Sequence, residues 1–176
     1  MELMDVILNR RSIRKYRDED ISEEKLEKIL QAGLLAPTSR NIKPCEFVVV
    51  RDKDVLSKLA KTKKYGGGML AKCNAAIVVI GDSEKSDTWI EDSAIALSYM
   101  NLMAANLGVG SCWCQIHLRS SLTGKDAEEA VREILSLAEK YRIVGMLALG
   151  IPDEEVKPYT LENADFTKVH GWEKKL

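Results

Sequence analysis

The sequence predicts a single globular domain in which helices and strands alternate along the chain. Its 176 residues match the size of one domain and are too few for two catalytic domains. Apolar residues make up 45% and charged residues 30%, a mixture that can bury a core and that differs from the composition of disordered chains. Segments with helical periodicity are separated by short apolar runs typical of strands. This alternation by itself favours an α/β fold with a parallel sheet.

Three helices and two strands are expected in the first half of the chain. Apolar residues three and four positions apart indicate the helices, and uninterrupted β-branched residues indicate the strands. Asp20 or Ser22 can cap the second helix, which ends before Pro37. Asp52 or Asp54 can cap the third. In chain order we expect a short helix over 4–8, a helix from about 20–22 to 35, a loop over 38–44, a buried strand over 47–50, a short helix over 55–59, a basic, glycine-rich loop over 61–68 and a buried strand over 75–81.

The second half is expected to hold the longest helix, one further helix and two strands. The longest helix should run from about Thr88 to Leu107, and Gly108 should stop it. Its predicted apolar stripe contains small residues that allow close approach of another helix, within the domain or at a subunit interface: Ile90, Ala94, Leu97, Asn101 and Ala104. A strand over 109–116, a helix over about 126–141 and a strand over 143–149 complete the body.

Residues 1–152 are expected to form the domain and residues 153–176 a C-terminal extension. The extension is mostly polar, with Tyr159, Phe166, Val169 and Trp172 as isolated large apolar side chains. Such a segment should lie along a surface, either its own or that of a partner.

Charge and hydropathy exclude several classes of protein. The 26 basic and 27 acidic residues give a net charge of −1, so no overall field would attract nucleic acid or an anionic membrane. The longest apolar stretch, residues 75–80, is far shorter than the ~20 residues of a membrane span. The N-terminus does not resemble a targeting signal, and the four cysteines are typical of reduced thiols, so a cytoplasmic protein is expected.

Within this balanced charge, residues 10–17 hold five cations and no acid. Arg10, Ser12 and Arg14 alternate, so in an extended segment their side chains would point the same way and present two guanidinium groups and a hydroxyl to one phosphate. The alternative is a solvated basic helix end, because such charge runs usually lie on the surface.

A second candidate is the polar loop between Pro37 and Pro44. Thr38, Ser39 and Asn41 supply short side chains that could hydrogen-bond the polar edge of a planar ring. Taken alone, these residues also fit an ordinary turn.

Four blocks in order give the chain a family resemblance. They are Arg-Arg-Ser-Ile-Arg-Lys-Tyr over 10–16, Ala-Pro-Thr-Ser-Arg-Asn-Ile-Lys-Pro over 36–44 ahead of the strand at 47–50, Asp-Ser-Ala-Ile-Ala-Leu from 92 leading to Leu-Gly-Val-Gly-Ser-Cys-Trp over 107–113, and Gly-Met-Leu-Ala-Leu-Gly-Ile-Pro over 145–152. Over essentially its whole length the chain resembles the nitroreductase family of flavoproteins.

The resemblance implies an α+β fold in three layers, with a central, mostly antiparallel sheet flanked by helices and a C-terminal tail that extends over the partner subunit. It implies a homodimer with FMN at the interface. Hydride would pass from NADH or NADPH to the flavin and then to a small electron-poor acceptor such as a nitroaromatic or a quinone. No side chain is expected to act as a catalytic group, because the flavin carries the chemistry.

The resemblance also implies which residues contact the cofactor. Arg10, Ser12 and Arg14 would hold the phosphate and ribityl chain, Thr38, Ser39 and Asn41 would reach the flavin from the other subunit, and a main-chain amide near Cys114 would bond the ring nitrogen that accepts hydride. The chain departs from the family at Cys45, where tryptophan is common, and at Gln115, where glycine is common. The full set of expected FMN contacts is Arg10, Arg11, Ser12, Arg14, Pro37, Thr38, Ser39, Asn41, Ser111, Cys112, Trp113, Cys114, Gln115 and Lys157.

Other functions stay open at this point. Cys112, Cys114 and His117, with Cys73 or His170, could form a zinc site, although a strand would direct His117 to the opposite face from the two cysteines. A flavin-binding protein without turnover, or a flavoenzyme of the same fold that removes halogen or remodels a flavin, would share the motifs. Hydrolase chemistry has no support, because the two histidines cannot be assigned to a triad.

Overall fold

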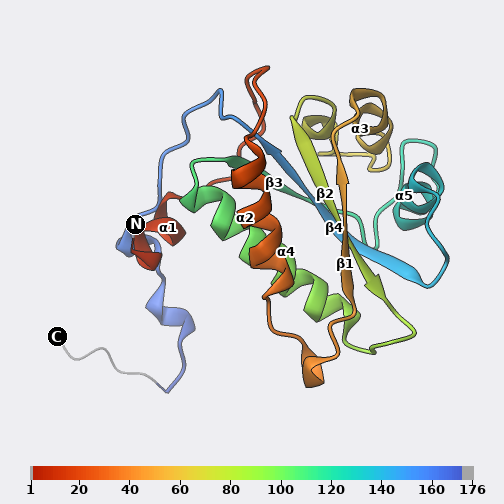
Figure 1. Ribbon diagram of the computed structural model, residues 1–176. Helices are drawn as coiled ribbons and strands as arrows, with labels where there is room; N and C mark the ends of the chain where they lie inside the picture. The colour runs from red at the N-terminus through yellow and green to blue at the C-terminus, as the bar shows by residue number, and fades with distance from the viewer. Residues whose placement is uncertain (1, 172–176) are drawn as a thin grey trace.

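An antiparallel sheet of four strands forms the centre of the computed structural model, which describes residues 2–171. The strand order is β1-β2-β4-β3, and every neighbouring pair is antiparallel (Figure 1). The strands are β1 (Cys45–Val50), β2 (Ala75–Asp82), β3 (Gly110–Gln115) and β4 (Tyr141–Gly150). The α+β fold implied by the family resemblance is confirmed, and the parallel sheet suggested by alternation alone is wrong.

Two pairs of helices cover the two faces of the sheet (Figure 1). The α2 helix (Glu23–Leu34) and the α4 helix (Trp89–Asn106) pack on one face, where Leu97 and Met100 lie in one core cluster with Ile77 and Leu147. The α3 helix (Lys53–Leu59) and the α5 helix (Ala127–Leu135) belong to the cluster on the opposite face. Helix, sheet and helix therefore form the three layers.

Strand burial follows position in the sheet. The central strand β2 is buried along its whole length, as the sequence predicts. The β1 strand, also expected to be buried, is instead an edge strand in which Val49 is 39% exposed. Its run of valines resembles that of a central strand, and the sequence alone does not reveal that, within residues 2–171, β1 pairs with β2 alone.

The helix caps agree with the sequence, and one helix is shorter than expected. The Ser22 hydroxyl accepts from the Lys25 amide at the start of α2, and Asp52 caps α3 in the same way. The last helix, expected to reach Tyr141, ends at Leu135 because Ser136 adopts a left-handed conformation with φ of 53°. The buried face of α4 also differs from the predicted stripe, since Ile90 is 36% exposed while Ser93, Ala96 and Met100 are buried.

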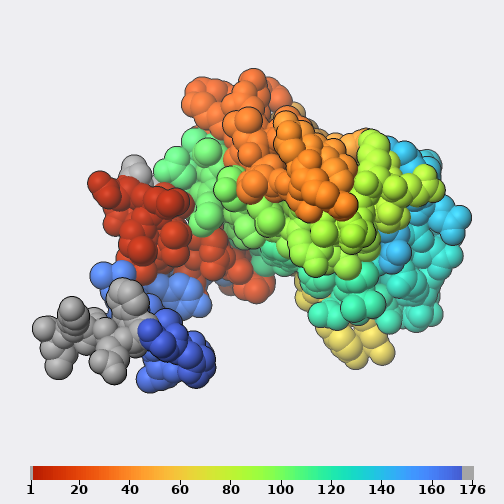
Figure 2. Space-filling model, turned by 90° about the horizontal axis from the view of Figure 1, so that it is seen from below, coloured from red at the N-terminus to blue at the C-terminus, as the bar shows by residue number. Residues whose placement is uncertain are grey.

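The N-terminal helix and the described part of the C-terminal tail lie together at one side of the molecule, where the Tyr159 amide donates to the Leu8 carbonyl at 2.9 Å (Figure 1). In the α1 helix (Leu3–Asn9) only Val6 is buried, whereas Met4 and Ile7 are largely exposed. The tail continues from β4 through two short 3₁₀ turns, Leu161–Asn163 and Phe166–Lys168, and protrudes from the body beside α1 (Figure 2). Tyr159 is 45% exposed, and Trp172 lies outside the described residues. No helix within residues 2–171 is both long enough and apolar enough to cross a membrane.

Candidate functional site

The basic segment leaves α1 in an extended conformation along the outer edge of β3. Arg10 ends the helix with φ of −61° and ψ of 117°, and Ser12 forms an isolated parallel bridge with Ser111. The Ile13 amide donates to the Ser111 carbonyl at 2.9 Å. The segment is therefore extended, which is the condition under which Arg10, Ser12 and Arg14 are predicted to point the same way.

Three side chains of this segment lie near Cys112. Burial raises the pKa of the Cys112 thiol, and four nearby groups oppose that rise: the charge of Arg14, a hydrogen bond with Ser12, and the charges of Lys63 and Arg10. Arg10, Ser12 and Arg14 therefore lie around the same residue of β3, as does Lys63 from the loop after α3.

Side chains of β3 separate onto the two faces of the sheet. Cys112 and Cys114 pack in the core on the α3 and α5 face, and burial raises the pKa of the Cys114 thiol to about 11. On the α2 and α4 side, the Trp113 indole donates to the Gln115 side-chain oxygen at 3.0 Å. The indole lies over Gly145, where an added Cβ would be 2.8 Å from the indole nitrogen. The predicted contacts from Ser111 to Gln115 therefore cannot all be side-chain contacts to one ligand.

The backbone of β3 presents an open edge beyond the Ser12 bridge. Backbone groups alternate between the two edges of a strand. Because the Ser111 carbonyl faces the basic segment, the amides of Trp113 and Gln115 face the same outer edge. The Ile116 amide donates to Val144 of β4 at 2.9 Å, in agreement with this alternation. A ligand at the outer edge could therefore reach the amides of Trp113 and Gln115, the two neighbours of Cys114. The Cys114 amide itself faces β4.

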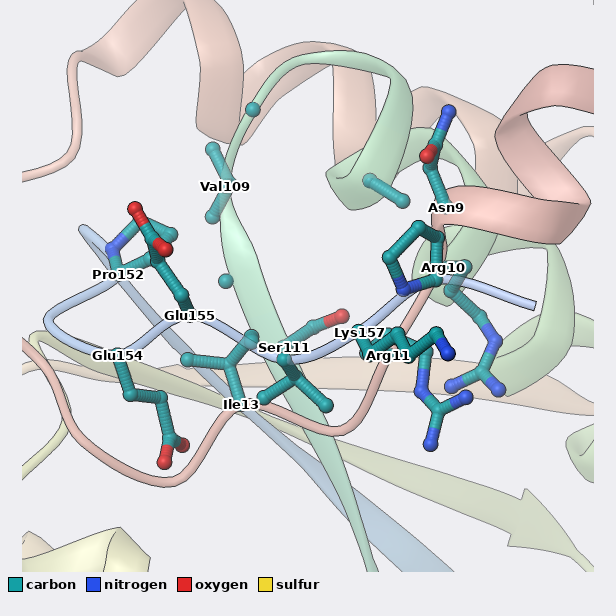
Figure 3. A pocket seen from close by; sticks show the side chains of 15 residues that line it. Asn9, Arg10, Arg11, Ile13, Val109, Ser111, Pro152, Glu154, Glu155 and Lys157 are labelled. Atoms are coloured by element: carbon teal, nitrogen blue, oxygen red, sulfur yellow. The ribbon is translucent and has the colours of Figure 1, made fainter.

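A cavity of about 630 Å³ borders the basic segment, and Arg10, Arg11 and Ile13 line it (Figure 3). Arg10, Arg11 and Lys157 lie together at one end, and Glu154 and Glu155 lie at the other. The Arg11 guanidinium stacks 4.0 Å from the centre of the Tyr159 ring, so it holds the tail. Arg10 and Lys157 are therefore the cations of this cavity that a phosphate could use alongside the Cys112 cluster.

The polar loop at residues 38–43 is fixed by a buried carboxylate. The Ser39 amide donates to Asp92 Oδ1 at 2.9 Å, and the Thr88 hydroxyl donates to Asp92 Oδ2 at 3.2 Å. Asp92 is 2% exposed. The Thr38 hydroxyl accepts from the Lys43 amide at 3.0 Å and closes the loop. Sequence reasoning included Asp92 in a family block but assigned it no role.

Within one chain, this loop does not meet the basic cluster. Asp92 lies in the first turn of α4, whereas Ala105, near the other end of that helix, lines the cavity beside Arg10. Thirteen residues of helix separate the two positions, about 20 Å at a rise of roughly 1.5 Å per residue. Pro37, Thr38, Ser39 and Asn41 therefore cannot share a ligand with Arg10 unless a second copy contributes one of the two sets.

We predict that Asp92→Asn loosens this loop without unfolding the protein. A hydrogen bond to a buried charged acceptor contributes about 1.5–3 kcal/mol, so exchange of the Ser39 amide with solvent should become roughly ten- to a hundredfold faster. Hydrogen-exchange NMR measures this rate directly. Glu91→Gln is the matched control, because Glu91 is an exposed acid in the same first turn of α4. Equal exchange in Asp92→Asn and wild type would contradict the assigned role of Asp92.

The possible zinc ligands do not point toward one shared position, as the ligands of a metal centre would. His117 Nδ1 lies 2.6 Å from Glu128 Oε1, and the thiols of Cys112 and Cys114 are enclosed in the core. Among residues 2–171 no group of three His, Cys, Asp or Glu side chains is placed to hold a metal ion.

Fold and site together define a class: an α+β protein with a group of cationic side chains along the outer edge of an antiparallel sheet. The nitroreductase family model matches residues 7–66 and 60–151. An NADH dehydrogenase/NAD(P)H nitroreductase of Archaeoglobus fulgidus is 37% identical over 166 residues, 92% of each chain. The chain therefore belongs to the nitroreductase family, and the predictions of the family and of an oxidoreductase are confirmed.

Solved structures agree with this assignment. An FMN-dependent nitroreductase from Clostridium difficile R20291 superposes with a TM-score of 0.92 at 43% identity, over 95% of this chain and 97% of that chain. A nitroreductase from Desulfovibrio desulfuricans, solved in complex with FMN, superposes with a TM-score of 0.74 at 26% identity, over 93% and 94% of the two chains.

Proposed function

We propose that this chain is an FMN-dependent oxidoreductase that takes hydride from NADH or NADPH and passes it to an electron-poor acceptor, a nitroaromatic or a quinone, in two separate half-reactions. The observation that carries the proposal is the convergence of Arg10, Ser12 and Arg14 beside the open edge of β3. Bound FMN would supply the hydride acceptor and donor, and the protein would bind and orient it.

The basic cluster fits a phosphate. Arg10 and Arg14 offer planar guanidinium groups that match phosphate oxygens, and Ser12 adds a hydroxyl. Lys63 adds a further charge near Cys112, and Lys157 adds charge from the cavity that it lines together with Arg10. Such charge-assisted bonds are the strong contacts of a nucleotide site.

The edge of β3 fits the polar rim of a flavin ring. The amides of Trp113 and Gln115 would donate to ring acceptors from a strand fixed by its pairing with β4. Cys112 and Cys114 contribute to the core beneath the site, and their raised thiol pKa values keep them protonated near neutral pH. These cysteines therefore position the strand without serving as nucleophiles.

A homodimer would complete the site. A groove of about 500 Å³ runs between α1, α2 and α4, and two of its lining residues, Leu3 and Tyr99, are 68% and 44% exposed. An apolar groove with exposed apolar side chains is typical of an interface between copies. The groove adjoins the helix that fixes the 38–43 loop, so the partner's loop could reach the flavin that Arg10 holds. The groove is lined by Leu3, Val6, Ala32, Tyr99, Leu102, Met103 and Asn106.

The visible spectrum and turnover of the purified protein test this function. We expect flavin absorption, release of FMN on denaturation, a dimer mass in sedimentation, and oxidation of NADH or NADPH that depends on an added quinone or nitroaromatic. A yellow protein that oxidises neither donor with either acceptor would contradict the reductase and favour a flavin-binding protein without turnover. Cytoplasmic location and the division at residue 152 stay predictions from the sequence.

A further inference from the structure

A second, cationic pocket lies beside the proposed flavin site. It has a volume of about 370 Å³ and lies between the loop after α3 and the turn after β3. The Lys64 amide donates to the Ser120 carbonyl at 2.8 Å and joins the two walls. The lining residues are Lys63, Lys64, Tyr65, Leu118, Arg119 and Ser120.

The pocket combines positive charge with an exposed aromatic ring. All of its charged lining side chains are cations, and Lys64 Nζ lies 5.4 Å from the centre of the Tyr65 ring. Tyr65 is 76% exposed. Cations beside an accessible aromatic ring suit a ligand that carries a phosphate next to a flat heterocycle.

The wall formed by the turn after β3 has a costly backbone conformation. Leu118 adopts φ of 57°, which a bulky side chain rarely tolerates, and its side chain is 75% exposed. The Arg119 guanidinium donates to the Leu118 carbonyl at 2.9 Å and supports the turn. The conformation places Leu118 and Arg119 at the pocket mouth instead of in the core.

Lys63 links the pocket to the proposed flavin site. Lys63 lines the pocket, and its charge also acts on the Cys112 and Cys114 thiols under β3. The turn lies three to five residues beyond Gln115, at most roughly 10–18 Å along an extended chain. If the nicotinamide ring of NADH or NADPH lies over the flavin at Gln115, the adenosine end of the same molecule would lie near this pocket.

We propose that this pocket binds the 2′-phosphoadenosine end of NADPH and makes the protein prefer NADPH to NADH. The 2′-phosphate is attached to the ribose that carries adenine, so a phosphate and a flat ring occur together, as Lys64, Arg119 and Tyr65 require. The bridging diphosphate, which NADH shares, lies between two riboses and would leave Tyr65 without a stacking partner. This assignment rests on the proposed function of the flavin site.

Steady-state kinetics of the FMN-loaded protein test the preference. In Lys64→Gln and Arg119→Gln we expect the KM for NADPH to rise about three- to tenfold at low salt while the KM for NADH and kcat stay unchanged. Lys58→Gln is the matched control, because Lys58 is an exposed lysine of α3 outside the pocket. Equal rises for both donors, or no rise for NADPH, would overturn the assignment.

Calorimetry separates failure of the pocket from failure of the proposed enzyme. We expect 2′-phosphoadenosine 5′-monophosphate to bind the wild-type protein more tightly than 5′-AMP, and this difference to disappear in the Lys64→Gln, Arg119→Gln double variant. Equal binding of the two probes to wild type would overturn the pocket even in an active enzyme. If the protein held no FMN but still distinguished the probes, the proposed function would fail and the pocket would stand.

Discussion

Arg10→Ala and Arg14→Ala are each expected to weaken FMN binding by about ten- to a hundredfold. Each removes a charge-assisted contact to phosphate that contributes about 1.5–3 kcal/mol, and a factor of ten corresponds to roughly 1.4 kcal/mol. Both guanidinium groups lie close enough to Cys112 to act on its thiol. Titration of flavin-free protein with FMN, followed by quenching of flavin fluorescence, measures the affinity. The double variant should bind more weakly than either single variant.

Two further variants show that this loss is specific. Arg17→Ala removes a cation from the same run, but Arg17 Nε lies 3.7 Å from Asp153 Oδ1 in an exposed pair, so FMN affinity should change less than twofold. Arg10→Lys should have an intermediate affinity, because an ammonium keeps the charge but loses the planar fork. Unchanged affinity in both Arg10→Ala and Arg14→Ala, with melting temperatures equal to wild type, would refute the phosphate site.

Local elements of the fold could be predicted from the sequence, because their signals lie within short segments. The Ser22 and Asp52 caps and the buried β2 strand depend on neighbouring residues. Sheet topology depends on distant ones. The chain from β2 through α4 does return to a strand parallel to β2, as helix and strand alternation suggests, but β4 inserts between β2 and β3 and is antiparallel to both.

Part of the candidate site could be predicted because side chains alternate in direction along an extended segment. Arg10, Ser12 and Arg14 are such a case, because their convergence needs only an extended backbone. Lys63 and Asp92 were not predicted as parts of the site because their roles depend on tertiary contacts. The charge of Lys63 acts on the Cys112 thiol of β3, and Asp92 accepts from the Ser39 amide 53 positions away. The sequence signal was present, in a basic loop and in an acid within the first turn of a helix, but both features are common on protein surfaces.

The buried ion cluster at Glu128 likewise depends on contacts between distant segments of the chain. The Glu128 carboxylate accepts from Arg142 Nε at 2.9 Å, from Arg142 Nη2 at 3.1 Å and from the Ile143 amide at 3.0 Å, and lies 2.6 Å from His117 Nδ1. Its side chain is only 3% exposed. It joins the first turn of α5 to β4 and to the turn after β3, which carries one wall of the cationic pocket.

Glu128→Gln is expected to lower the free energy of unfolding by about 3 kcal/mol. Removing one partner of a buried ion pair leaves the other charge uncompensated, which costs about 3–5 kcal/mol, and the low end applies because the Arg142 side chain is 39% exposed. Urea unfolding followed by circular dichroism measures the loss. Glu129→Gln is the matched control, since Glu129 is 52% exposed and 3.8 Å from Lys125, and it should change stability by less than about 0.5 kcal/mol.

The difference in the free energy of unfolding between wild type and Glu128→Gln should also depend on pH. Burial alone would raise the pKa of Glu128, but the hydrogen bonds from Arg142, the Ile143 amide and His117 outweigh it and hold this pKa below its usual value of 4.5. A carboxylate with a lowered pKa in the folded state stabilises the fold above its unfolded pKa and loses that contribution as pH falls through the folded pKa. The stability difference should therefore be constant near neutral pH and shrink below about pH 4.5. A difference that grew on acidification would show that Glu128 is held protonated in the fold, contrary to the bonds it accepts.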